Sequence, residues 1–154
     1  MFKLMRLVSL LIGILVMTTP SAGYATDFTT PQGAVRALEE AYKARDIEAA
    51  AAARDFREEA RQLLLRHDPQ KAADPEMLRQ GAILMEVMFE EEMKQTGFPN
   101  YAGLTCVVSE PTYVGDSVVK VTERCQSSDG SVSEQHFLVF LGSQGWRVIG
   151  MAYE

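Results

Sequence analysis

The chain has 154 residues, of which 47% are hydrophobic and 23% are charged, enough for one domain with a buried core. Its formal net charge is −6, which argues against nucleic acid and anionic lipid surfaces as partners. A basic protein partner would suit this charge, and the alternative interpretation is that the charge only keeps the protein soluble.

The start of the chain has the three parts of a secretory signal. Lys3 and Arg6 are basic, residues 7–17 form an apolar run, and small residues follow up to a cleavage point after Ala25 or, alternatively, Ala22. The apolar run is short compared with a membrane span of about 20 residues, which favours a cleaved signal over an uncleaved anchor.

Removal of this signal peptide, residues 1–25, leaves residues 26–154 as a single domain that we expect in the periplasm or outside the cell. This part carries 13 basic and 21 acidic residues, a formal net charge of −8. No later stretch is long and apolar enough to span a bilayer, so no membrane association is expected after cleavage. The oligomeric state stays open, with a homodimer as one alternative.

The first half of the domain has helical spacing and a series of N-terminal capping signals. The expected caps are Thr29 or Thr30 before Pro31, Asp46, Asp55, and Asp74 before Pro75. Glu58 lies three residues after Asp55, the spacing of a reciprocal capping box. The longest helix starts at Asp74 and Pro75 and stops at Gly97. Its wide apolar stripe predicts that this helix lies across the core.

From Leu104 onward the sequence changes to β-branched and aromatic residues. They fill four segments, residues 104–114, 117–126, 131–141 and 146–153. Short turn signals containing glycine separate the segments. We therefore expect an α+β fold in which the N-terminal helices pack on a curved, cone-like antiparallel meander of four strands.

The first turn signal predicts a disulfide. A two-residue loop at Gly115 and Asp116 places Cys106 directly opposite Cys125 on the neighbouring strand. An even number of cysteines in an exported chain is typical of a disulfide, and opposed strand residues are close enough to form one. A bulge at Pro111 would shift this pairing.

The second turn signal predicts a polar pair. A two-residue loop at Asp129 and Gly130 places Glu123 opposite His136, on the sheet face that also carries Cys125. A carboxylate beside an imidazole can orient it and raise its basicity, which prepares a general base. The alternative is that the two residues are ordinary cross-strand partners at the edge of a sheet.

Two segments carry a resemblance to a known family. "TPQGAVRALEEAYKARDIEAAAA" and "GSQGWRVIGM" resemble the opening helix pair and the last hairpin of the nuclear transport factor 2-like (cystatin-like cone, SnoaL-like) superfamily. The resemblance implies a pocket between a curved sheet and its helices. The residues expected to line that pocket are Met85, Leu138, Met151 and Tyr153. The superfamily includes cyclases, isomerases and dehydratases, and also binding domains and some bacterial immunity proteins.

The sequence has no motif that specifies an enzyme activity. It lacks a nucleophile elbow, a phosphate-binding glycine loop and a His-Glu-x-x-His pair, and its cysteines and histidines have no zinc-site spacing, so neither a metal nor another cofactor is expected. We expect an exported, non-enzymatic binding protein, most concretely a periplasmic immunity protein that neutralises a toxin from a rival bacterium. The residues expected to contact the protein partner are Glu90, Glu91 and Glu92. The alternatives are a small-ligand carrier, or a lyase or isomerase that uses Glu123 and His136.

Overall fold

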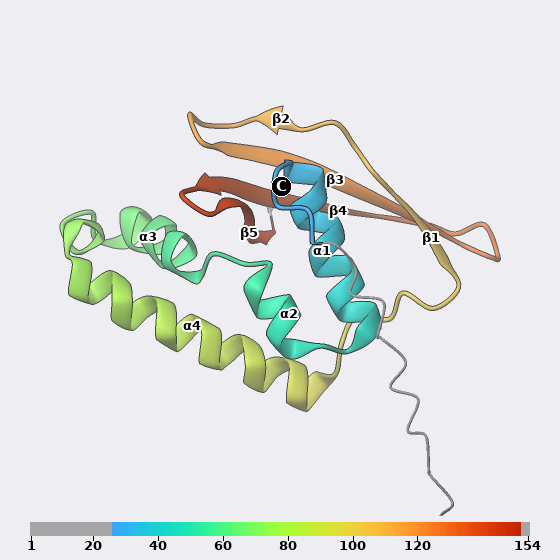
Figure 1. Cartoon of the computed structure of the whole chain (residues 1–154), viewed down its shortest axis with the longest axis horizontal. Helices are drawn as coiled ribbons and strands as arrows, with labels where there is room; N and C mark the ends of the chain where they lie inside the picture. The colour runs from blue at the N-terminus through green and yellow to red at the C-terminus, as the bar shows by residue number, and fades with distance from the viewer. Residues whose placement is uncertain (1–25, 152–154) are drawn as a thin grey trace, which may run out of the picture.

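The computed structural model describes residues 26–151, so the expected signal peptide and Tyr153 lie outside the described part. The predicted α+β class is confirmed, with the helices first in the chain and an antiparallel sheet after them, but the sheet has five strands and not four (Figure 1). The helical elements are α1 (Pro31–Ala44), α2 (Ile47–Ala52), α3 (Phe56–His67), the 3-10 turn η1 (Lys71–Ala73) and α4 (Pro75–Thr96). The strands are β1 (Leu104–Val108), β2 (Thr112–Tyr113), β3 (Val118–Ser127), β4 (Val132–Gly142) and β5 (Gly145–Met151).

The expected helix caps are present. Each cap side chain accepts a hydrogen bond from a first-turn amide, and the four cap residues are Thr30, Asp46, Asp55 and Asp74. The predicted hydrogen bond from the Asp55 amide to the Glu58 side chain, which would complete the capping box, is wrong. The Glu58 carboxylate instead accepts hydrogen bonds from the Arg61 guanidinium group, at 2.6 and 2.7 Å. The Asp55 amide, which Glu58 was expected to satisfy, donates to the Val148 carbonyl of β5 at 2.9 Å.

The sheet is a meander in the order β1-β3-β4-β5, with the short β2 also paired to β3. The first expected strand is divided in two near Pro111, which cannot donate a backbone hydrogen bond. Just before it, the Ser109 hydroxyl accepts the Thr122 amide at 3.0 Å, in place of a backbone acceptor. The pairing then resumes one residue out of register, with Thr112 opposite Lys120. The sequence therefore predicted the meander but not this fifth strand.

One face of the sheet is covered by α1, and the core lies between them (Figure 1). Val35 and Leu38 of α1 are buried against inward-facing residues of the central strands. These strand residues are Val119, Val121, Phe137, Val139 and Val148.

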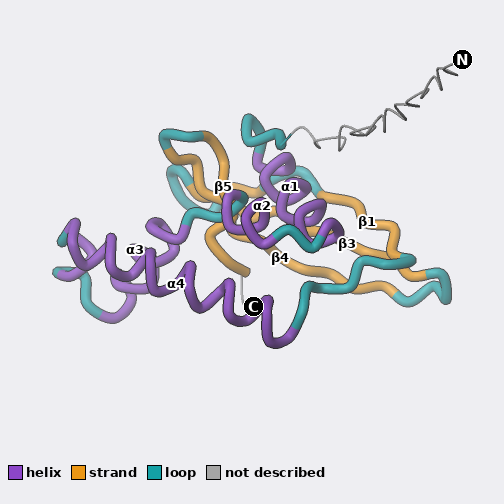
Figure 2. Tube along the Cα trace, turned by 60° about the horizontal axis from the view of Figure 1, so that its bottom comes forward, coloured by secondary structure: helices purple, strands orange, loops and turns teal. Residues whose placement is uncertain are grey.

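The expectation that α4 lies across this core holds for only part of the helix: Phe89 belongs to the core cluster and Ala82, Met85 and Met93 pack against it, but much of α4 lies on α3 instead. Figures 1 and 2 show α3 and α4 side by side, projecting beyond the sheet that α1 covers. Only Leu78 and Phe89 of α4 are buried. Since α1 already occupies the inner sheet face, α4 packs on α3 and keeps much of its apolar stripe exposed. Within residues 26–151, no helix combines the length and apolarity that a membrane span requires.

Candidate functional site

The structure separates Glu123 from His136. The β3–β4 turn has three residues, 128–130, because Gly130 adopts a left-handed conformation with φ of 85° and the Ser127 amide donates to the Ser131 carbonyl at 3.0 Å. This turn pairs His136 with Thr122, and Glu123 with Gln135. A change of one residue in register moves a side chain to the opposite sheet face. The predicted Glu123–His136 pair is therefore wrong.

Glu123 lies on the inner face of the sheet and is fully buried. The Tyr101 hydroxyl donates to one carboxylate oxygen at 3.1 Å, and the other oxygen has no hydrogen-bond partner among the described residues. Burial raises the pKa of Glu123 to about 7, with a further contribution from the charge of Glu39 on α1. Lys43, whose ammonium nitrogen lies 2.5 Å from Glu39, opposes this increase in the pKa of Glu123.

Tyr101 is affected by the same cluster. Desolvation raises the pKa of its phenol, and the charge of Glu123 raises it further, so this hydroxyl stays protonated and acts as a donor. Sequence reasoning missed Tyr101, Glu39 and Lys43. Glu39 could have been found, because it continues the helical stripe of Val35 and Leu38 onto the buried face of α1.

The predicted disulfide is confirmed. Cys106 and Cys125 are directly opposite on β1 and β3, with their Cα atoms 4.0 Å apart. Their sulfur atoms and a Glu123 oxygen lie within 4.8 Å of one another. Metal ligation would need the two thiolates, which the disulfide consumes, so this group offers only the carboxylate as a ligand.

His136 lies on the outer face of the sheet, away from α1. Its Nδ1 atom is 2.9 Å from the Thr122 hydroxyl, and its side chain is half-buried. Leu138 alternates with the buried residues Phe137 and Val139, so it lies on the outer face together with His136. The predicted register placed Leu138 on the same face as Cys125, and this prediction is wrong.

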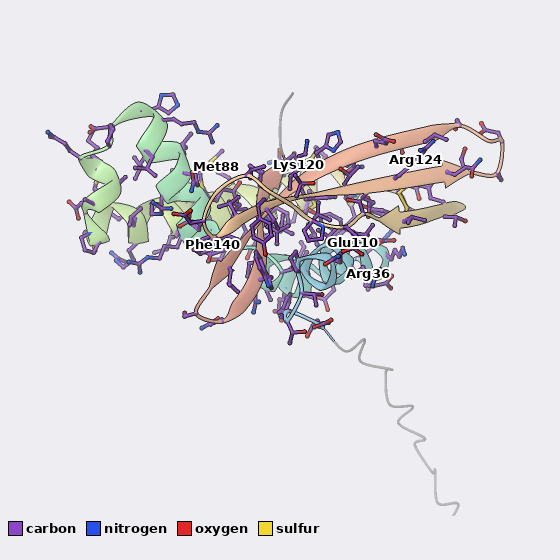
Figure 3. All side chains as sticks on the ribbon, turned by 90° about the horizontal axis from the view of Figure 1, so that it is seen from above. Arg36, Met88, Glu110, Lys120, Arg124 and Phe140 are labelled. Atoms are coloured by element: carbon purple, nitrogen blue, oxygen red, sulfur yellow. A yellow bond between two sulfur atoms is a disulfide. The ribbon has the colours of Figure 1, made fainter. Side chains whose placement is uncertain are left out.

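A groove of about 890 Å³ lies between α3 and α4. We call it the α3–α4 groove. Its apolar lining comprises Phe56, Ala60, Leu63, Leu64, Met77, Gly81, Leu84, Met85, Met88 and Phe89. Leu84 and Met88 are 60% and 61% exposed, although both are large apolar side chains and lie next to each other on one helix face. Figure 3 shows Met88 on the helical part, far from Arg124 on the sheet.

The groove also has polar side chains in its lining. Arg54 donates to both carboxylate oxygens of Glu59 at 2.8 Å, and its guanidinium group lies over the rings of Phe56 and Phe89 at 5.2 and 4.8 Å. Glu91, Glu92, Gln95 and Thr96 line the groove near the C-terminal end of α4.

Several residues that the sequence singled out meet at this groove. Met85 was expected in a pocket between the sheet and the helices and lines this groove between two helices instead. Glu91 and Glu92, expected at a partner surface, line it as well. Glu90 lies on the same helix outside the lining and pairs with Lys94 at 3.6 Å. Met151 ends β5 and is 47% exposed.

Comparisons with known proteins add little to this description. No family model and no curated protein matches the chain. Among solved structures, a ketosteroid isomerase-like protein from Erwinia carotovora atroseptica SCRI1043 shares 14% sequence identity, with a TM-score of 0.40 over 82% of this chain and 93% of that one. The function is therefore argued from the residues of this chain.

Proposed function

We propose that the protein is an exported binding protein that takes part of another protein into the α3–α4 groove. The observation that carries this proposal is the apolar lining of the groove, with Leu84 and Met88 more than half exposed. Water-exposed apolar surface of this kind costs free energy until a partner covers it, at about 25 cal/mol for each Å².

A protein occupant fits better than a small ligand, because the exposed apolar surface extends beyond the groove. Ile83 and Val87 are 49% and 51% exposed and lie outside the groove lining, on the neighbouring face of α4. A small-ligand pocket buries most of its ligand within a concave site. A ligand held inside the groove would leave Ile83 and Val87 in water, whereas a protein surface can cover them as well.

The geometry does not favour the alternative that the protein is a lyase or isomerase, because the two residues expected to act together are separated. Glu123 and His136 lie on opposite faces of the sheet, so the carboxylate cannot orient the imidazole. Glu123 is also fully buried and does not line the α3–α4 groove. A substrate would have to open the contact between α1 and the sheet before it reached this carboxyl group.

The most concrete version of the proposal is an immunity protein that neutralises a toxin delivered into the periplasm. A secretory signal and a net charge of −8 on residues 26–154 support it, since an acidic protein attracts a basic partner over a distance. A toxin or secretion gene beside the gene for this chain would add support.

The test is capture of a partner from periplasmic extract by residues 26–154, with two matched variants. Leu84→Asp places a charge in the groove, whereas Leu65→Asp places the same charge at a 39% exposed leucine of α3 outside the groove lining. We expect Leu84→Asp to abolish capture of a specific protein and Leu65→Asp to retain it. Equal capture by both variants, or a small molecule that co-purifies in the groove in place of a protein, would contradict the proposal.

A further inference from the structure

We propose that the occupant of the α3–α4 groove is an amphipathic helix of the partner protein, with lysine or arginine side chains where it passes Glu91 and Glu92. This inference rests on the function proposed above and adds the chemical class of the segment that is bound.

The length of the α4 wall of the groove suits a helix. The lining on α4 runs from Met77 to Thr96, nearly the whole of this 22-residue helix, and the lining on α3 is shorter, from Phe56 to Leu64. At 1.5 Å per residue the α4 stretch is about 28 Å long, which corresponds to about 19 residues or five turns of a second helix lying alongside.

The spacing of the lining also suits a helix. The residues of α4 that line the groove include Met77, Gly81, Leu84, Met88 and Glu92, which follow one another at intervals of three or four. The side chains of this row project from one face of α4 and leave a gap at Gly81, so a side-chain ridge of another helix can pack against this face.

Small residues bring α3 and α4 together along the floor of the groove. A Cβ atom added at Gly81 would lie 3.1 Å from the Cβ atom of Ala60, so the two helix backbones approach closely at this point. Leu63 and Leu84, which are larger, line the groove as well. The result is a channel with a backbone-lined floor and apolar sides, into which large side chains of a partner helix can insert.

Methionine side chains make the walls of the groove adaptable to occupants of different shape. Met77, Met85 and Met88 all line the groove. Methionine is unbranched and polarisable, so it repacks around apolar side chains of different shapes, a property common to surfaces that bind amphipathic helices.

The charges of the groove determine the orientation of the occupant. Arg54 is neutralised by Glu59, while Glu91 and Glu92 lie in the last turns of α4, where the helix dipole adds partial negative charge. Lys94 pairs with Glu91 at 2.9 Å and with Glu90 at 3.6 Å, and Glu92 takes part in no ion pair within residues 26–151. This end of the groove therefore favours a cationic side chain over an anionic one.

The experiment uses residues 26–154 and three synthetic peptides of about 19 residues, the length of the groove. The first has an apolar helical stripe and lysines in one terminal turn, the second has glutamates in place of the lysines, and the third is a scrambled order of the first. Fluorescence anisotropy gives the dissociation constants, and circular dichroism reports helix formation on binding.

We expect the lysine peptide to gain helix on binding. It should also bind about tenfold more tightly than the glutamate peptide, a difference of about 1.4 kcal/mol that two or three exposed charge pairs can supply. Glu91→Lys with Glu92→Lys should reverse this order of preference. Leu84→Asp should abolish binding of the lysine peptide, and Leu65→Asp should leave it unchanged.

Three outcomes would overturn the inference. Equal binding of the scrambled peptide would indicate unspecific apolar contact. A dimer in sedimentation equilibrium that Leu84→Asp dissociates would assign the groove to a second copy of the chain. Failure of the lysine peptide to bind would exclude the basic helix. If capture of a partner protein still depends on Leu84 in that last case, the proposed function stands; if it does not, both proposals fail.

Discussion

Glu123→Gln tests the buried carboxyl group under α1. The substitution keeps the shape of the side chain and an oxygen that can accept the Tyr101 hydroxyl, but it removes the ionisation. We expect the variant to become more stable than the wild-type protein as the pH rises, because glutamine cannot acquire a charge in this fully buried position.

The size of the effect follows from the pKa of Glu123, which increases from the ordinary value of 4.5 to about 7 in the folded protein. The folded state therefore binds this proton more tightly than the unfolded state. Stability from this group is complete below pH 4.5, falls as the pH rises towards about 7, and levels off above it. A tenfold change in proton affinity corresponds to about 1.4 kcal/mol, so the total loss is about 3 kcal/mol.

The assay is urea unfolding of both proteins, with the disulfide intact, at intervals from pH 5 to pH 8.5. The difference in unfolding free energy between Glu123→Gln and the wild type should grow in favour of the variant across this range. Glu76 and Asp129 have pKa values lowered to about 2, so they titrate below this range and do not contribute. A difference that stays constant from pH 5 to pH 8.5 would refute the reasoning.

Glu39→Gln is the control for the electrostatic part of the argument. The charge of Glu39 is the second cause of the raised pKa of Glu123, after burial. Its removal should lower the pKa of Glu123 and move the midpoint of the pH-dependent loss to a lower pH. An unchanged midpoint would indicate that burial acts alone.

Three further predictions follow from the disulfide, the acidic end of α4 and the outer sheet face. Free-thiol labelling of the protein, denatured without reduction, should find no thiol, and two labelled thiols per chain would contradict the bond. Cys106→Ser with Cys125→Ser should cost about 3 kcal/mol of unfolding free energy for a sequence separation of 19. Replacement of glutamates 90–92 by lysine should slow partner association and flatten its salt dependence without altering the circular dichroism spectrum, because exposed charges steer encounter; unchanged kinetics would exclude this role. His136→Ala should keep partner binding and lower stability by about 1 kcal/mol through loss of the Thr122 contact, and abolished binding in a folded variant would contradict this.

The helical half of the chain was predictable from sequence because its signals are local. A cap such as Thr30, Asp46 or Asp74 acts on an amide two or three residues away, so the sequence contains both partners of the contact. The prediction of the capping box was wrong because one of its hydrogen bonds was replaced by a contact with a residue far along the chain. The Asp55 amide found a partner on β5, more than ninety residues later, and no local pattern indicates that contact.

The disulfide was predicted correctly although its turn was not. The Val114 amide donates to the Val118 carbonyl, which makes the β2–β3 turn one residue longer than expected. The irregularity between β1 and β2 then shifts the pairing back by one residue and restores the predicted partners, Cys106 and Cys125. No such irregularity follows the β3–β4 turn, so the same error in turn length moved His136 to the other face of the sheet.

The sequence alone determined the element types and their order, because periodicity, caps and turn residues depend on near neighbours. It also showed that α4 has a wide apolar face that needs to be covered. Only the tertiary structure decided what covers it: α1 occupies the sheet, α3 packs on one side of α4, and Leu84 and Met88 stay exposed beside the groove. An apolar pattern records that a face avoids water but not which element or which other protein shields it, since the hydrophobic effect has no direction.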